Sequence, residues 1–243
     1  MGRLNVDAQE LDARLATNGE DLDLLQSGYT VIETGPLDAL LPGWRDNPPP
    51  VCVPATEDEF WYLTRDGGRR FPIVPPGMRN HGNVIVSLGA MCAWLAPQAE
   101  ALGVEIFPGF AAAETLHAED GRVLGVRIGD MGIAKDGKPR GDFTRGMELR
   151  AKYTLFAEGA RGSLSKVLIA NYGLDRGRQP QKFGIGLKEL WQVAPEKHRP
   201  GLAQHSFGWP LDNRTGGGSF LYHYGENLVS VGFVVHLNYR KPW

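Results

Sequence analysis

Two glycine-containing segments carry the residue types that could hold a ligand. Residues 154–166, TLFAEGARGSLSK, are typical of an apolar strand that ends in glycines and enters a helix near Ser163. Such a turn directs free backbone N–H groups and the helix dipole to one place, which suits a phosphate. Gly159 and Gly162 would let a ligand approach the backbone. An ordinary strand-to-helix turn is the alternative, because no GxGxxG sequence follows a strand and no Walker A loop is present.

The second segment, residues 214–223 (RTGGGSFLYH), places three consecutive glycines before an aromatic strand. Glycines in such a position mark either a turn or a close approach to the backbone, and a hairpin turn is the simpler interpretation.

A third segment, residues 24–44, combines apolar residues, glycines and Trp44 in a way that suits a membrane interface. A buried irregular loop is the alternative there.

Other kinds of reactive site find little support in the sequence. Cys52 and Cys92 lie far apart, so they supply neither the thiolates of a zinc site or an iron–sulfur cluster nor a disulfide framework. Among the six histidines, only His223 and His236 fall on neighbouring expected strands, and a histidine satisfied within a sheet is the simpler interpretation. No Ser-His-Asp or Cys-His signature is recognisable. Because the two cysteines do not suggest a disulfide framework, a reducing compartment is expected.

Composition limits the class of protein that has to position these segments. The 243 residues contain 26 Lys and Arg against 28 Asp and Glu, a net charge of −2, so the basic excess of a nucleic-acid binder is missing. The 32 glycines and 17 prolines exclude a helical bundle. The first residues lack the apolar core of a signal or transit peptide.

Apolar periodicity predicts one α/β part followed by a half that is richer in antiparallel sheet. Helices are expected at residues 7–17, 88–102 and 163–171. A polar, Gly-rich excursion is expected over residues 131–146. Strands are expected at 57–64, 84–86, 104–107, 113–117, 122–128, 148–151, 152–156, 183–193, 205–208, 219–224 and 228–237.

Several stretches closely resemble one enzyme family, the electron transfer flavoprotein–ubiquinone oxidoreductases. The resemblance runs from about residue 24 to residue 243. The stretches that carry it are LDALLPGW (37–44), HGNVIVSLGAMCAWLAPQAEALGVEIFPGFAAAE (81–114), GIAKDGKPRGDFTRGMELRAK (132–152), FAEGARGSLSK (156–166), FGIGLKELWQV (183–193), GWPLD (208–212) and GGSFLYH (217–223).

The resemblance implies a mixed α/β flavoprotein fold of the FAD/NAD(P)-binding type and an enzyme peripheral to the inner membrane, with the cytoplasmic face favoured in a bacterium. It implies electron transfer from reduced electron transfer flavoprotein to ubiquinone through FAD and one [4Fe-4S] cluster. By the same resemblance, Gly217 and Gly218 contact ubiquinone, and Ala112, Glu158 and Gly159 lie near FAD. A valine at either of the two quinone glycines is then expected to impair quinone reduction while stability stays near normal.

The sequence also departs from the family pattern. The GxGxxG turn of the first βαβ unit is missing, and the cluster-binding cysteines are absent from this chain. We therefore expect a non-family segment at residues 1–23, a partial FAD-binding domain at 24–182 that includes a membrane-associated segment at 24–44, and a partial ubiquinone-binding domain at 183–243. A related FAD-dependent, quinone-linked dehydrogenase, a flavin hydroxylase and a non-enzymatic gene remnant are the alternatives.

Overall fold

A computed structural model describes residues 28–239, which form two compact units. The first unit contains residues 28–104 and 182–239, and the second contains residues 105–181. The segment expected at 1–23, with its helix at 7–17, lies outside the described residues. The domain boundaries drawn from the sequence at 23/24 and 182/183 stay predictions. Contacts within the chain join the stretch before residue 105 to the stretch after residue 181.

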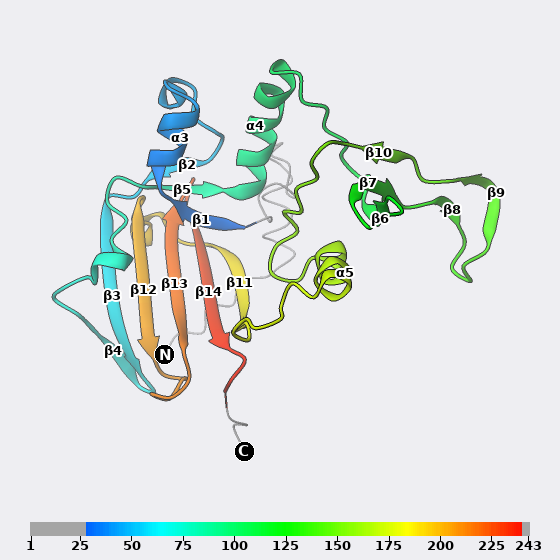
Figure 1. Ribbon diagram of the computed structural model, residues 1–243. Helices are drawn as coiled ribbons and strands as arrows, with labels where there is room; N and C mark the ends of the chain where they lie inside the picture. Colours follow the sequence, from blue (N-terminus) through cyan, green and yellow to red (C-terminus); the bar gives the residue numbers. More distant parts are fainter. Residues whose placement is uncertain (1–27, 240–243) are drawn as a thin grey trace. The chain divides into compact units, whose positions relative to one another are not determined.

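A six-stranded sheet forms the base of the first unit (Figure 1). Its strands, in order across the sheet, are β11 (Gly184–Gln192), β14 (Leu228–His236), β13 (Gly217–Tyr224), β12 (Leu202–Gly208), β3 (Glu57–Thr64) and β4 (Gly67–Arg70). The strand pair β12–β3 is parallel, and the other neighbours are antiparallel. The strands expected in the C-terminal half therefore form, and β3 joins them from far away in the sequence.

A smaller, three-stranded sheet covers part of this base. Its order is β1 (Tyr29–Ile32), β5 (Val84–Ser87) and β2 (Cys52–Pro54), all antiparallel. Alternating side chains of β5 face opposite ways, as strand geometry requires. Ile85 packs in a cluster with Ala203 and Tyr224 of the six-stranded sheet, while Val84 and Val86 pack against Leu37 and Trp44.

Helices lie on the outer side of the smaller sheet. They are α3 (Thr34–Leu40) and α4 (Leu88–Ala101), and the 3-10 turn η1 (Trp44–Asp46) follows α3. Two further 3-10 turns of the first unit are η2 (Pro76–Met78) and η3 (Pro195–Lys197). The Ser87 hydroxyl accepts a hydrogen bond from the Ala90 N–H at 3.3 Å and so caps α4. The helix predicted over 88–102 is confirmed, whereas α3 was not predicted.

The second unit holds two further sheets and one helix. One sheet has the order β10 (Glu148–Arg150), β7 (Val123–Ile128) and β6 (Ala112–His117), and the other pairs β8 (Met131–Ile133) with β9 (Pro139–Thr144); the helix is α5 (Ser163–Tyr172). The predicted hairpin and helix are confirmed, and the expected excursion is itself a hairpin. The strands predicted at 104–107 and 152–156 are wrong. Within residues 28–239 neither stretch pairs with a neighbouring strand, and strand formation depends on such pairing.

Candidate functional site

Gly217 and Gly218 open strand β13 in the middle of the six-stranded sheet, between β14 and β12. Gly217 has φ +142°, where residues with a side chain are strained. A Cβ on Gly217 would overlap the Val234 carbonyl oxygen of β14, and a Cβ on Gly218 would overlap the Ser206 carbonyl oxygen of β12. The pair therefore allows close packing of three strands and leaves a stretch of bare backbone.

Strand register defines a second feature, which we call the aromatic face of the sheet. Phe60 and Tyr62 of β3 are partners of His205 and Phe207 of β12, so these four side chains share one face. Phe220 is the partner of His205 across β13, and Phe207 Cα lies 3.7 Å from where a Cβ on Gly218 would stand. The glycine pair thus adjoins a row of aromatic rings.

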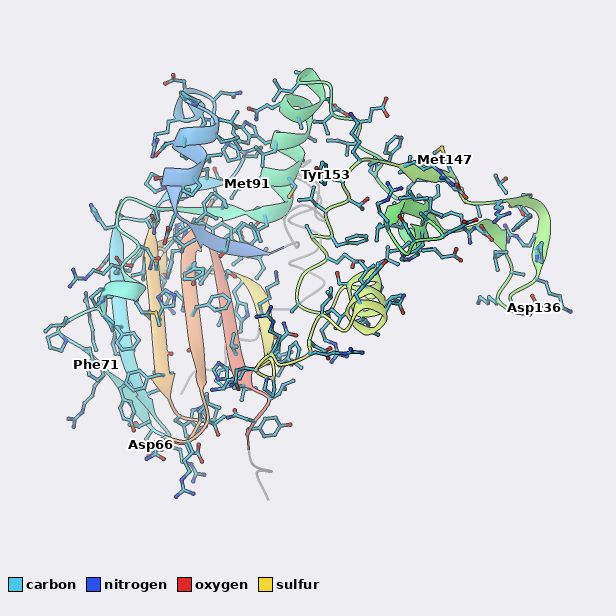
Figure 2. All side chains as sticks on the ribbon, viewed as in Figure 1. Asp66, Phe71, Met91, Asp136, Met147 and Tyr153 are labelled. Atoms are coloured by element: carbon cyan, nitrogen blue, oxygen red, sulfur yellow. The ribbon has the colours of Figure 1, made fainter. Side chains whose placement is uncertain are left out.

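The outer part of the aromatic face is open to solvent. The ring centroid of Phe207 lies 5.1 Å from that of Phe60, 5.2 Å from that of Tyr62 and 5.7 Å from that of Phe71. Phe71 follows directly after β4. Figure 2 shows Phe71 beside the β3–β4 hairpin, whose tip carries Asp66. Tyr62, Phe71 and Phe207 are each exposed, as is Trp209 after β12. Sequence reasoning missed this cluster, because the parallel pairing of β3 with β12 assembles it.

The inner part of the aromatic face carries a polar pair, the half-buried His205 and the buried Tyr222. His205 Nε2 lies 2.9 Å from the Tyr222 hydroxyl, and the two rings meet edge to face at 5.5 Å. Burial lowers the pKa of His205, against the opposing charge of Asp58. Burial also raises the pKa of Tyr222 to about 12. Both groups are therefore neutral near pH 7.

The opposite face of the sheet holds an ionic cluster. Glu59 is 3% exposed and accepts hydrogen bonds from Trp61 Nε1 at 2.7 Å and from Arg199 at 2.8 Å, while Arg70 lies 3.2 Å away. Burial opposes the charge of Glu59, but the hydrogen bonds from Trp61 and Arg199 and the two guanidinium charges together lower its pKa. Glu59 of β3 is thus paired with Arg70 of β4 and with Arg199 before β12, and loss of a partner would leave a buried charge with weaker compensation.

His223 lies beside this cluster, and not beside His236 as the sequence had suggested. Its ring centroid is 5.4 Å from that of His198, and its Nδ1 accepts the Arg199 backbone N–H at 3.1 Å. Burial and the neighbouring His198 and Arg199 lower the pKa of His223 to about 4. The ring is thus a neutral acceptor within the sheet, in agreement with the simpler interpretation.

The expected phosphate position at the start of α5 is occupied by the protein itself. Glu158 accepts the backbone N–H of Leu164 at 3.2 Å, and both the N–H and the hydroxyl of Ser165 at 2.7 Å. A Cβ on Gly162 would overlap the Glu158 side chain, so Gly162 makes room for this carboxylate. The hydrogen bonds from Ser165 lower the pKa of Glu158. The junction therefore binds an internal anion.

The other residues expected near FAD also belong to the second unit. Gly159 has φ +74°, and a Cβ there would meet none of the described atoms within 4 Å. Ala112 is exposed at the start of β6 and is the strand partner of Ile128. Their roles toward FAD stay predictions. The glycine pair belongs to the first unit.

Residues 28–44 of the segment expected at the membrane are partly internal. Trp44 is 5% exposed, and its Nε1 donates to the Asp38 carboxylate at 2.7 Å. Trp44, which the sequence suggested for a membrane interface, is instead buried, because its ring packs with Leu37 against the smaller sheet. Leu40 is exposed. In the part of the chain that the structure describes, no helix is long and apolar enough to cross a bilayer.

Metal-binding groups are absent from residues 28–239: no three His, Cys, Asp or Glu side chains gather in a way that could hold an ion. Cys52 is half-buried in β2 and Cys92 is exposed on α4.

Comparison with known proteins gives one clear family. Residues 183–243 match the ubiquinone-binding family description "ETF-QO, ubiquinone-binding", and this region contains β11, β12, β13 and β14. The chain is 46% identical over 238 residues to the electron transfer flavoprotein–ubiquinone oxidoreductase of Pseudomonas aeruginosa, and 51% identical over 210 residues to the mitochondrial one of Bos taurus.

These matches cover 96% and 85% of this chain, but 43% and 34% of the relatives. The chain thus spans less than half the length of either relative. The first match takes in more than residues 24–243, so it reaches into the segment that the sequence analysis set apart.

Among solved structures, a geranylgeranyl bacteriochlorophyll reductase-like protein of Thermoplasma acidophilum has a similar fold. Its TM-score is 0.56 at 13% identity, over 86% of this chain and 46% of that one. The mixed α/β fold class with several sheets is confirmed. On the strength of its sequence relatives, this chain belongs to the electron transfer flavoprotein–ubiquinone oxidoreductase family.

Proposed function

We propose that this chain supplies the ubiquinone-binding part of an enzyme that transfers electrons from reduced electron transfer flavoprotein to ubiquinone. The observation that carries the proposal is the match of the ubiquinone-binding description to residues 183–243. These residues form four strands of one sheet, and Gly217 and Gly218 lie near its centre. The two partners are thus electron transfer flavoprotein and ubiquinone.

The glycine pair and the aromatic face suit a quinone head group. A quinone ring is flat and apolar, and its carbonyl oxygens accept hydrogen bonds but donate none. Bare backbone at Gly217 and Gly218 offers a flat wall, and Phe207 beside it offers an aromatic surface. We propose that the head group lies against Gly218 on the aromatic face.

The residues present fit a flavin only in part. Gly159 leaves open backbone in the second unit, which suits a close approach of FAD. The N–H groups of Leu164 and Ser165, however, are taken by the Glu158 carboxylate, which would repel a pyrophosphate. This junction does not fit the phosphates, and Glu158 is therefore not a position that faces FAD. We propose that the two remaining expected residues, Ala112 and Gly159, face the cofactor. A [4Fe-4S] cluster does not fit the donor set, because it needs four thiolates and the chain has two cysteines.

We further propose that the chain rests on a membrane surface through the outer part of the aromatic face. Phe71 and Trp209 are exposed there, Ile73 is exposed in the segment after β4, and the β3–β4 hairpin adds Arg65 and Arg69. Aromatic side chains partition to the interface of a bilayer, and basic residues are drawn to anionic headgroups. We propose with it a peripheral location on the inner membrane, on the cytoplasmic face in a bacterium, and the exposed aromatic residues support attachment to a membrane surface.

Binding of a short-chain ubiquinone to the full chain tests the proposal. Quinone is titrated while tryptophan fluorescence is recorded, and we expect saturable quenching. Phe207→Ser should weaken binding by roughly 5- to 10-fold, since it removes a stacking surface. Leu187→Ser is the matched control, because Leu187 is exposed on the other face of the same sheet. Quenching that does not saturate, or equal effects of both variants, would contradict quinone binding on the aromatic face.

A further inference from the structure

His205 stands beside the proposed quinone position without belonging to the glycine pair. It is two residues along β12 from Phe207, on the same face of the sheet. Side chains two residues apart on one strand face are about 7 Å apart. A flat ring that lies against Gly218 and Phe207 would therefore bring one of its carbonyl oxygens close to the imidazole.

Tyr222 decides which nitrogen of His205 carries the proton. The Tyr222 hydroxyl is buried, and within residues 28–239 its hydrogen-bond partner is His205 Nε2 at 2.9 Å. A buried hydroxyl that failed to donate would carry a desolvation cost. The phenol therefore donates to Nε2, and the proton of the neutral imidazole must sit on Nδ1.

The Nδ1–H group of His205 is free to bind a ligand. Among the described residues no partner accepts a hydrogen bond from it. Nδ1 is also absent from the set of fully buried polar atoms without a partner, so the atom is accessible to solvent. Asp58 is the charged group that acts on the ring, but its carboxylate is engaged by the Asn80 side-chain amide and by the N–H groups of Asn80 and His81. The imidazole thus presents one solvent-accessible donor beside the aromatic rings.

Resting on the function proposed above, we propose that His205 donates a hydrogen bond from Nδ1–H to one carbonyl oxygen of the quinone head group. Tyr222 is the positioning residue that keeps the proton on Nδ1.

Two consequences follow for the reaction. The oxygen gains negative charge as electrons reach the quinone, so a hydrogen bond from a neutral donor strengthens during reduction. Because burial lowers the pKa of His205, the ring stays a neutral donor at pH 7 and does not attract anions in place of quinone. His205 would thus select for a carbonyl oxygen at this place.

Infrared spectroscopy on the full 243-residue chain tests the inference directly. Short-chain ubiquinone labelled with ¹³C at one or the other carbonyl is bound, and its C=O stretch is compared with that of free quinone. We expect one labelled carbonyl to shift to lower frequency by an amount typical of a hydrogen bond, and the other to stay nearer its free value. His205→Phe should abolish this shift and weaken binding roughly 5- to 10-fold, the worth of one hydrogen bond.

Two further variants separate the donor from its positioning residue. His205→Asn should restore part of the shift, because its amide N–H takes the place of Nδ1–H. Tyr222→Phe should broaden the shifted band, since the proton can then occupy either nitrogen. His117→Phe is the matched control: His117 Nδ1 lies 3.0 Å from the Tyr172 hydroxyl in the second unit, and its loss should leave the quinone spectrum unchanged.

The outcomes distinguish this inference from the proposed function. Saturable quinone binding with both carbonyls at their free frequencies, or with a shift that survives His205→Phe, overturns the role of His205 and leaves quinone binding in place. Failure of the wild-type chain to bind quinone overturns both. A thermal melt of each variant confirms that it is folded, and if His205→Phe unfolds, the comparison of wild type with His205→Asn and Tyr222→Phe decides.

Discussion

Gly218 lies so close to Ser206 on the neighbouring strand that a methyl group on Gly218 would overlap the Ser206 carbonyl oxygen. Gly217 stands in the same relation to Val234 on the other side. The sequence predicted that valine at either position would spare stability, and the structure predicts otherwise. Packing of three strands requires both glycines, whether or not a quinone lies against them.

Gly218→Ala should therefore destabilise the chain. The added methyl group forces β13 and β12 apart, and overpacking of this kind costs about 1–3 kcal/mol. The unfolding midpoint in urea measures the loss. Gly67→Ala in the same sheet is the control, because a Cβ there meets no described atom within 4 Å, and a change within about 0.5 kcal/mol is expected. Equal midpoints for the two variants would contradict this account.

The chain should bind FAD weakly or not at all. Glu158 already occupies the first N–H groups of α5, and the sequence has no GxGxxG turn to hold a pyrophosphate elsewhere. Gel filtration of the chain with excess FAD measures co-elution by the absorbance of the flavin at visible wavelengths. Stoichiometric flavin in the protein peak would show that the phosphates bind at a place other than α5.

The cap on α5 should weaken in acid. Hydrogen bonds from Ser165 lower the pKa of Glu158 below its ordinary value of 4.5, so the cap is fully formed above pH 4.5 and is lost as the pH falls through the lower, folded-state value. Glu158→Ala should remove the cap at every pH. Hydrogen exchange of the α5 amides measures both effects, and Glu119→Ala in the β6–β7 turn serves as the control. Unchanged protection in Glu158→Ala would refute the cap.

The first unit should lose stability as the pH is lowered from 6.5 to about 4, because His223 titrates differently in the folded and unfolded chain. Burial and the neighbouring His198 and Arg199 lower its pKa from 6.5 to about 4, so the unfolded chain binds more protons than the folded chain in this window. The free energy of unfolding must then fall as the pH is lowered through it.

Urea unfolding at several pH values measures this slope. His223→Gln should flatten it, because the amide oxygen can accept the Arg199 N–H without titrating. His205 contributes a residual slope of the same sign, since its pKa is also lowered. His81→Gln, at an exposed position, should leave the slope as it is. If His223→Gln retains the wild-type slope, other groups control the acid response.

Membrane attachment should depend on the exposed aromatic residues and only weakly on Leu40. Phe71→Ser and Trp209→Ser remove interfacial side chains, whereas Leu40→Ser tests the segment 24–44. Flotation with vesicles that contain anionic lipid measures the bound fraction, and Leu187→Ser is the control from the opposite face of the sheet. A larger loss with Leu40→Ser than with Phe71→Ser would return the attachment to residues 24–44.

Local pattern sufficed for the elements whose signals lie close together in the chain. The apolar stripe of α4, the Asp-Gly turn between β6 and β7 and the glycine before α5 each predict an element from fewer than twenty residues, and the structure confirms all three. The family could also be inferred from the sequence, because its motifs are contiguous stretches. The glycine pair could be selected for the same reason.

Tertiary structure decided which faces and contacts those elements acquire. Parallel pairing of β3 with β12 brings together residues about 145 positions apart, as in Tyr62 and Phe207, and no local pattern encodes that register. Burial of Trp44 and the turn of Glu158 onto α5 likewise depend on which surface lies opposite. The type of a side chain determines which environment stabilises it: an apolar side chain requires apolar neighbours, and a carboxylate requires hydrogen-bond donors. Only the folded chain determines whether a membrane, a ligand or the protein itself supplies it.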